Sequence, residues 1–257
     1  MSKTTKSLPQ NFINWASSLS GCDGGNPAAP IWISGIEWGF KEGDPTEYYT
    51  KTLPAEIAQG EYTPSFAGYD WKDSLTYTYG RSAAKLYCAI KGENIANYKE
   101  VIVKCDGSEI FRTNLYPIAF SSTDALLWKK YKLDELTGFA EKHLFKTWCF
   151  LHRFSSISKI VKERAPKLII GTGVSYLTDF FACYAGAIAV DKAINMGEIA
   201  PDANNPNGKA RQYYWARLEN GTTLVVVPFF SSQSGLNSDY LLQEMGKVIG
   251  ALVSSPG

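Results

Sequence analysis

Residues 166–173 have the sequence Pro-Lys-Leu-Ile-Ile-Gly-Thr-Gly, in which a helix stop precedes an apolar run and a glycine turn. Pro166 ends the preceding helical pattern, because proline has no N–H to donate. Residues 168–170 are apolar on both faces, which is typical of a strand in a parallel sheet covered by helices on each side. A helical pattern follows over 174–189. The stretch therefore predicts the strand-to-helix unit of an α/β protein.

Similar patterns recur along the chain. Further strands are predicted at 31–33, 110–116, 212–218 and 222–228. Helices are predicted at 8–20, near 50–59, and at 80–91, 134–163 and 238–253. Between them lie a long surface excursion and a polar loop, at 39–74 and 196–211. Because strands alternate with helices, we expect a single domain over 1–257, a three-layer α/β/α sandwich with a mostly parallel central sheet.

The charge balance limits the classes of partner. The chain carries 26 Lys and Arg against 25 Asp and Glu, so its net charge is +1. This argues against a long electrostatic footprint on nucleic acid, and it leaves room for a local basic groove. The basic residues within 142–167 are interpreted as the solvated face of a helix.

Cysteine and histidine usage argues against a metal or a disulfide framework. The five cysteines are odd in number and form no CxxC, and the two histidines lie nine residues apart. We therefore expect no metal and no cofactor. The N-terminal residues lack the apolar core of a signal peptide, and no run of 18 apolar residues exists. These features favour a cytoplasmic protein without a membrane partner, and we expect a monomer.

The loop after the first predicted strand is the first candidate site. It reads Gly35-Ile36-Glu37-Trp38-Gly39, in which glycines on either side allow a ligand to approach the backbone. Glu37 would orient a water molecule or act as a general base. The alternative is a turn at the strand end with a solvated Glu37.

Asn114 lies near the end of the next predicted strand, 110–116. Its amide offers one acceptor and two donors, which suits the Watson–Crick edge of a pyrimidine. The alternative is an Asx turn that caps the strand.

The loop after the last predicted strand is rich in small polar residues, and its sequence is Ser232-Gln233-Ser234-Gly235-Leu236-Asn237. Hydroxyl groups before a helix can hold a phosphate, and Leu236 would act as a wedge in a base stack. The alternative is an ordinary loop that caps the helix, with Asn237 or Ser238 as the cap.

Gly171-Thr172-Gly173 does not complete a dinucleotide fingerprint. The third glycine of GxGxxG is replaced by Tyr176, and no acidic residue follows at the expected strand end. The segment is therefore interpreted as a plain strand-to-helix turn.

Taken in order, these segments resemble the uracil-DNA glycosylase superfamily. GIEWG is similar to the family's opening pocket loop, which reads GINPG, GEAPG or GQDP in different branches. Residues 79–86 (YGRSAAKL) resemble FVGRSGQLL, and 110–115 (IFRTNL) resemble FITNVVK. Residues 166–173 resemble PKVVVALG, and 227–237 resemble the closing loop written HPSPLS or NPSGLS.

The resemblance implies a role for each matching residue. Glu37 stands where the family places its water-activating residue, and Asn114 where the family reads the base. Ser232 stands where the family has His or Asn, and serine is a poorer donor to a developing charge. Tyr79 is one of the aromatic residues expected to stack on the base. The remaining expected contacts to substrate are Gly35, Ile36, Trp38, Gln233, Ser234, Gly235 and Leu236.

Three functions stay open at this point. The first is a DNA glycosylase-like protein that flips out a damaged or deaminated base, uracil or a related one, and hydrolyses its N-glycosidic bond. The second is a catalytically weak or inactive module that binds a base, a nucleotide or modified nucleic acid. The third is a different hydrolase on the same scaffold. The expected partner is single- or double-stranded DNA, or a ligand that contains a nucleobase.

Overall fold

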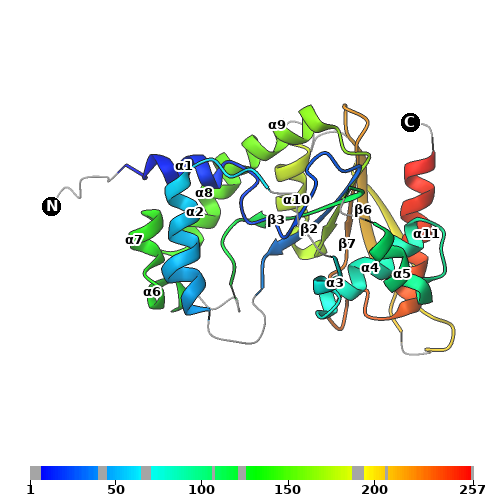
Figure 1. The fold of residues 1–257 in the computed structure, drawn as a ribbon. Coiled ribbons are helices and arrows are strands. Elements are labelled where there is room, and N and C mark those ends of the chain that lie inside the picture. Colours follow the sequence, from blue (N-terminus) through cyan, green and yellow to red (C-terminus); the bar gives the residue numbers. More distant parts are fainter. Residues whose placement is uncertain are drawn as a thin grey trace.

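The protein folds around a seven-stranded mixed sheet, as the computed structural model in Figure 1 shows. The structure describes residues 7–39, 45–64, 71–105, 108–120, 126–186, 194–205 and 208–255. The strand order is β1-β3-β2-β4-β7-β6-β5. The strands are β1 (Gly24–Gly25), β2 (Ile31–Glu37), β3 (Ile110–Tyr116), β4 (Leu168–Thr172), β5 (Asn195–Ile199), β6 (Arg211–Arg217) and β7 (Thr223–Val227).

The centre of the sheet is parallel. β3, β2, β4 and β7 run in one direction, and their registers pair Gly35 with Asn114 and Ile33 with Ile170. β1 is antiparallel to β3 at one edge, and β6 and β5 continue antiparallel beyond β7. The central strands β3, β4 and β7 are buried along their whole length. β4 and β7 are mostly apolar, as strands between two helical layers usually are, whereas β3 also buries Arg112, Thr113 and Asn114.

Helices cover both faces of this sheet (Figure 1). One layer packs on Ile33, Ile170 and Val225 and is made of α3 (Trp71–Ser74), α4 (Thr78–Ile90), α5 (Tyr98–Lys104) and α11 (Asp239–Ser254). The other layer packs on Trp32, Phe111 and Ile169, and it contains α1 (Gln10–Ala16), α2 (Leu53–Gln59), α6 (Leu126–Lys130), α7 (Leu133–Thr137), α8 (Lys142–Trp148), α9 (Phe154–Arg164) and α10 (Leu177–Tyr184). Four short helical turns join these elements: η1 (Tyr48–Thr52), η2 (Ile95–Asn97), η3 (Cys149–Arg153) and η4 (Val174–Tyr176).

The α/β class and the mostly parallel centre of the sheet confirm the sequence prediction. Every predicted strand is present, and helices occur near 50–59, 80–91 and 238–253 as expected. The helix predicted over 174–189 ends at Tyr184, and 187–189 lie outside the described residues.

Two predictions about local structure are wrong. The loop predicted at 196–211 begins with β5, which is an exposed edge strand held by its pairing with β6. Its sequence, Asn-Met-Gly-Glu-Ile, has no clear period of two, so only the neighbouring strand defines it. The single helix predicted at 134–163 is divided into α7, α8, η3 and α9, because Gly138 adopts a left-handed conformation after α7.

Arg153, the last residue of the π-helical turn η3, joins the second helical layer to the strands. It is fully buried, and Nε donates to Leu115 O at 2.9 Å. Nη1 donates to Ala16 O and Ser18 O, and Nη2 to Ser20 O, at 2.6 to 2.9 Å. The guanidinium therefore satisfies carbonyl groups of the loop after α1 and of β3 together.

Within the described part of the chain, no helix is long and apolar enough to cross a membrane.

Candidate functional site

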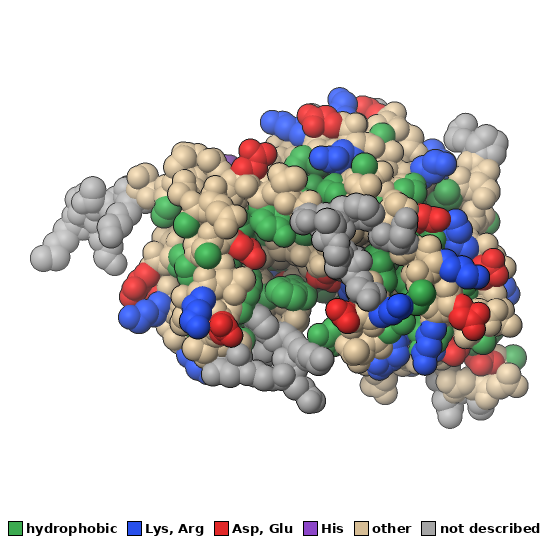
Figure 2. All heavy atoms as spheres, in the orientation of Figure 1, with side chains coloured by type: hydrophobic (Ala, Val, Ile, Leu, Met, Phe, Trp, Pro, Cys, Tyr) green, Lys and Arg blue, Asp and Glu red, His purple; other side chains and the backbone are tan. Residues whose placement is uncertain are grey.

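The strand order itself locates a crevice. β2 is the first of the parallel strands, and the next two, β3 and β4, pair with it on opposite sides. Chains that leave β2 and β4 therefore diverge, and open α/β sheets bind ligands at this point, outside the carboxyl ends of the strands. Figure 2 shows the molecule hollowed between the region of α2 and the region of α3, and the carboxyl end of β2 points toward this hollow in Figure 1.

Glu37, the last residue of β2, forms an ion pair with Lys142 at the start of α8. Lys142 Nζ lies 3.1 Å from Oε1 and 3.1 Å from Oε2 of Glu37. The two side chains are only 14% and 9% exposed. The prediction of a solvated turn at Glu37 is therefore wrong, and so is the interpretation of Lys142 as part of a solvated face.

One oxygen of this carboxylate has spare capacity to accept a hydrogen bond. Glu37 Oε2 is buried and accepts no well-aligned hydrogen bond from the described residues, although the Lys142 ammonium lies nearby. The ammonium 3.1 Å away compensates the charge of this buried oxygen, and its remaining acceptor capacity is what a water molecule would have to use.

A second group of polar side chains lies one helical turn further along α8. Lys146 Nζ is 4.2 Å from the ring centre of Tyr116 and 5.0 Å from that of Tyr176. Burial raises the pKa of Asp179 in α10, while a hydrogen bond from Tyr116 and the Lys146 cation oppose this rise. These residues line the continuation of the same edge, because Tyr116 pairs with Glu37 in the register of β2 and β3.

Asn114 lies on the neighbouring strand and packs against Gly35. Its Nδ2 donates to Gly21 O at 2.8 Å and to Asp23 Oδ1 at 3.3 Å. Asp23 in turn pairs with Arg112 at 2.8 Å, so the orientation of the amide is fixed. Both donor hydrogens are used within the protein, and the amide oxygen is the group left to accept a hydrogen bond from a ligand. The part of the prediction in which Asn114 offers its donors to a base is thus not supported by this geometry.

Tyr79 enters the same region from the first turn of α4. Its hydroxyl lies 3.1 Å from Thr172 Oγ1, and Thr172 donates to Ser34 O at 3.0 Å. Burial raises the pKa of Tyr79 to about 12, so this hydroxyl stays protonated at neutral pH. The Arg112 guanidinium lies 5.4 Å from the centre of the Tyr79 ring and 5.4 Å from that of Trp71. This ring is therefore packed on protein groups, and the Thr172 hydroxyl that Tyr79 contacts links the carboxyl ends of β4 and β2.

The rest of the opening loop is more accessible. Ile36 is half-buried and lies against Gly173, while Trp38 is 43% exposed and packs edge-on against Tyr48 at 5.9 Å. Trp38 is therefore an aromatic side chain at the strand end with surface that a ligand can reach.

The closing loop lies beside Tyr79, whose ring is 6.0 Å from that of Phe229. Arg211 holds this loop in place by donating to Gly235 O at 2.8 Å and to Gln233 O at 3.2 Å. Gln233 and Ser234 are exposed, Ser232 is half-buried, and Gly235 is buried, with no room for a Cβ against Phe229 O. Ser238 caps α11 by accepting from Leu241 N, which the capping alternative anticipated.

Leu236 is fully buried in the core beneath α4 and α11. Its predicted role as a wedge is wrong for this conformation, because the side chain has no surface to insert into a base stack. An apolar residue in a polar loop suits either an exposed wedge or a core anchor, so the loop's composition does not distinguish the two roles.

Sequence reasoning missed three residues of the site. The sequence pattern predicts Lys142 and Lys146 on a solvated helical face, and it offers no signal for Asp23. The signal that could have found the lysines is their spacing of four residues on one helical face. Among the described residues, no three His, Cys, Asp or Glu side chains gather as a metal site would require.

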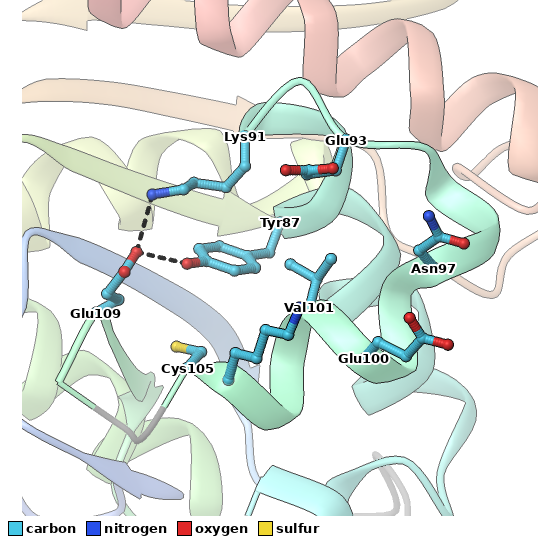
Figure 3. Close-up of a pocket in the computed structure, with 9 residues that line it drawn as sticks. Tyr87, Lys91, Glu93, Asn97, Glu100, Val101, Cys105 and Glu109 are labelled. Carbon is cyan, nitrogen blue, oxygen red and sulfur yellow. Dashed lines mark hydrogen bonds and ion pairs between the residues drawn. The ribbon is translucent and has the colours of Figure 1, made fainter.

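A cavity of about 230 Å³ lies at the opposite edge of the sheet (Figure 3). It is lined by α4, α5 and Glu109, which immediately precedes β3. Tyr87 donates to Glu109 at 2.5 Å and Lys91 pairs with the same carboxylate at 3.1 Å. Lys91 and Glu109 therefore neutralise each other within it, and it lies at the amino ends of the strands. We place the functional site at the carboxyl ends instead.

Comparison of the chain with models of protein families, with curated proteins and with solved structures found no match.

Proposed function

We propose that this protein binds an extruded nucleobase at the carboxyl ends of β2, β3 and β4 and hydrolyses its N-glycosidic bond. One observation carries the proposal: the Glu37 carboxylate and the Asn114 amide come from neighbouring parallel strands at the same sheet edge, where Gly35 pairs with Asn114. The resemblance of the surrounding segments to uracil-DNA glycosylases assigns the same two positions to water activation and base contact.

In the proposed mechanism, Glu37, Asn114 and Trp38 each have a separate role. Glu37 would hold a water molecule through Oε2 and direct it at the anomeric carbon as the glycosidic bond breaks. Asn114 would accept a hydrogen bond from an N–H of the base, because its own donors are used. Trp38 is the accessible aromatic side chain for stacking, which contributes about 1–3 kcal/mol per base.

The departing base carries negative charge and needs hydrogen-bond donors. Ser232 is the side chain at the position that the resemblance assigns to this task. Removing one well-placed donor from such a site costs about 2.7–4 kcal/mol, or roughly 10²–10³ in rate. A serine hydroxyl in place of His or Asn therefore predicts a slow enzyme.

Binding without cleavage is the second candidate function. It is favoured by the same Glu37–Lys142 ion pair, because the ammonium lies 3.1 Å from each carboxylate oxygen and competes with a water molecule for them. On this hypothesis the site keeps its affinity for a nucleobase and has lost the hydrolytic step.

The test is release of free base from labelled oligonucleotides that contain uracil, hypoxanthine or a thymine mismatch, as single strands and as duplexes. We expect slow release by the wild type and at least a 100-fold loss in Glu37→Gln. Glu47→Gln, an exposed carboxylate of another segment, is the control and should match the wild type. Retarded DNA migration without release would select the binding function, and neither release nor binding would reject both.

A further inference from the structure

We infer that Lys142 is a positioning residue for Glu37, one that fixes the carboxylate in the orientation needed to hold water. This inference rests on the proposed function, because it concerns the same site. No motif in the sequence pointed to it, since the two residues are separated by 105 positions.

The geometry is that of a clamp around a carboxylate. Lys142 Nζ is equidistant from the two oxygens of Glu37, at 3.1 Å, so rotation of the carboxylate would break one of the two contacts. The ammonium also lies 3.5 Å from the centre of the Phe120 ring, so an aromatic ring packs against it in addition to the carboxylate. The lysine side chain is long and flexible, so ordering it costs conformational entropy. An ion pair on the surface contributes too little free energy to offset this cost.

The surroundings make the ion pair sensitive to pH. Burial lowers the pKa of Lys142 from its ordinary value of 10.5, the Glu37 carboxylate opposes this shift, and the Lys146 cation adds to it. Tyr49 of η1 also senses Glu37, and its own pKa is raised mainly by burial. Asp179 and Tyr116 lie next to Lys146. Loss of the Lys142 proton would therefore release the carboxylate at a pH below 10.5.

The decisive measurement is the pH profile of base release between pH 6 and 10.5 for wild type, Lys142→Arg and Lys142→Met. We expect kcat of Lys142→Met to fall about 100-fold with little change in KM, since a small misplacement of a reacting group has this effect. The wild type should lose activity at the alkaline end. Lys142→Arg should keep most of its activity and lack this alkaline loss, because a guanidinium stays protonated throughout.

Lys129→Met, which removes a lysine from an exposed pair with Asp134, is the control and should leave the profile unchanged. A residue with a merely structural role would lower the melting temperature without moving the alkaline limb. An alkaline limb that is identical in wild type and Lys142→Arg would therefore overturn the inference. The comparison of wild type with Lys142→Arg tests the inference even if Lys142→Met fails to fold.

A measurement without catalysis separates failure of this inference from failure of the proposed function. The Lys142 side chain is titrated by NMR in the wild type and in Glu37→Gln. We expect Lys142 to lose its proton at lower pH in Glu37→Gln, because the carboxylate opposes the effect of burial. If the titration of Lys142 shifts but the protein releases no base, the glycosidic reaction is rejected and the positioning of Glu37 by Lys142 stands. If the titration of Lys142 does not change, the positioning role itself is overturned.

Discussion

The Arg153 guanidinium donates from Nε to the carbonyl oxygen of Leu115 at 2.9 Å, which connects the π-helical turn η3 to the buried strand β3. The same group donates to main-chain oxygens of Ala16, Ser18 and Ser20. None of these acceptors is a carboxylate, so among the described residues the hydrogen bonds of this cation go to neutral dipoles. Several backbone carbonyls thereby depend on one side chain for their hydrogen bonds.

Arg153→Met should lower the free energy of unfolding by about 3–5 kcal/mol, because it leaves buried carbonyl groups without donors. Arg153→Lys should recover only part of this loss, since an ammonium lacks the planar fork that reaches several acceptors. Urea denaturation followed by tryptophan fluorescence measures both changes. Arg164→Met, at an exposed position of α9, should stay within about 0.5 kcal/mol of wild type, and an equal loss in both variants would refute the role of Arg153.

Gly35→Ala should impair the site more than it destabilises the fold. A Cβ at this position would lie 2.5 Å from Asn114 Oδ1, so the amide must shift out of its place against the strand. We expect a loss of at least 10-fold in affinity for base-containing oligonucleotides, with a cost of about 1–3 kcal/mol in stability. Gly39→Ala is the matched control, because a Cβ there comes within 4 Å of none of the residues that the structure describes. Unchanged binding by Gly35→Ala would place the base elsewhere.

Leu236→Ala should lower the free energy of unfolding by about 2–5 kcal/mol, because it opens a cavity in the core. Leu151→Ala, at a 62% exposed position, should have almost no effect. Thermal denaturation of both variants checks this directly. If Leu236→Ala were as stable as wild type and slower only in acting on duplex DNA, the wedge role would be restored.

Stability should fall as pH rises above 9, because the unfolded chain can ionise thiols that the fold keeps protonated. Burial raises the pKa of Cys149 from its ordinary value of 9.0 to about 12, against the opposing charges of Arg153 and Lys146. An acid whose pKa is higher in the folded state favours unfolding once pH exceeds the unfolded value. The expected slope is about 1.4 kcal/mol per pH unit for this thiol, between pH 9 and 12.

Cys149→Ala isolates that contribution. The variant will be less stable at pH 7, because a buried side chain is truncated, yet its stability should decline less steeply above pH 9. Parallel urea titrations from pH 7 to 10 give the two slopes. Slopes that do not differ would show that Cys149 ionises as easily in the folded protein as in the unfolded chain.

The sequence predicted the centre of the fold well, because its signals there are local. The apolar runs that became β4 and β7 are buried on both faces, so their composition alone distinguishes them from loops. The exposed edge strand β5 was missed, since its conformation depends on pairing with β6. The break between α7 and α8 was missed as well, because an apolar helical period continues across Gly138.

The site could be predicted only in outline. Glu37 and Asn114 were located from their positions at strand ends, which follow from the order of strands and helices along the chain. Their partners could not be derived in this way: Lys142 lies 105 residues from Glu37, and Gly21 lies 93 residues from Asn114. Which donors and acceptors remain for a ligand depends on these long-range contacts, so sequence patterns alone could not reveal it.

The π-helical turn η3 has a consequence for how this chain tolerates changes in length. It lies without interruption between α8 and α9, and each residue of a helix advances the direction of the next side chain by about 100°. Deleting one residue there, even the solvent-facing Leu151, would rotate α9 relative to α8. Phe145 and Arg153 could then no longer both point inward. This turn sets the rotation of one helix relative to the next. Natural variation should therefore substitute residues within the turn far more readily than insert or delete them.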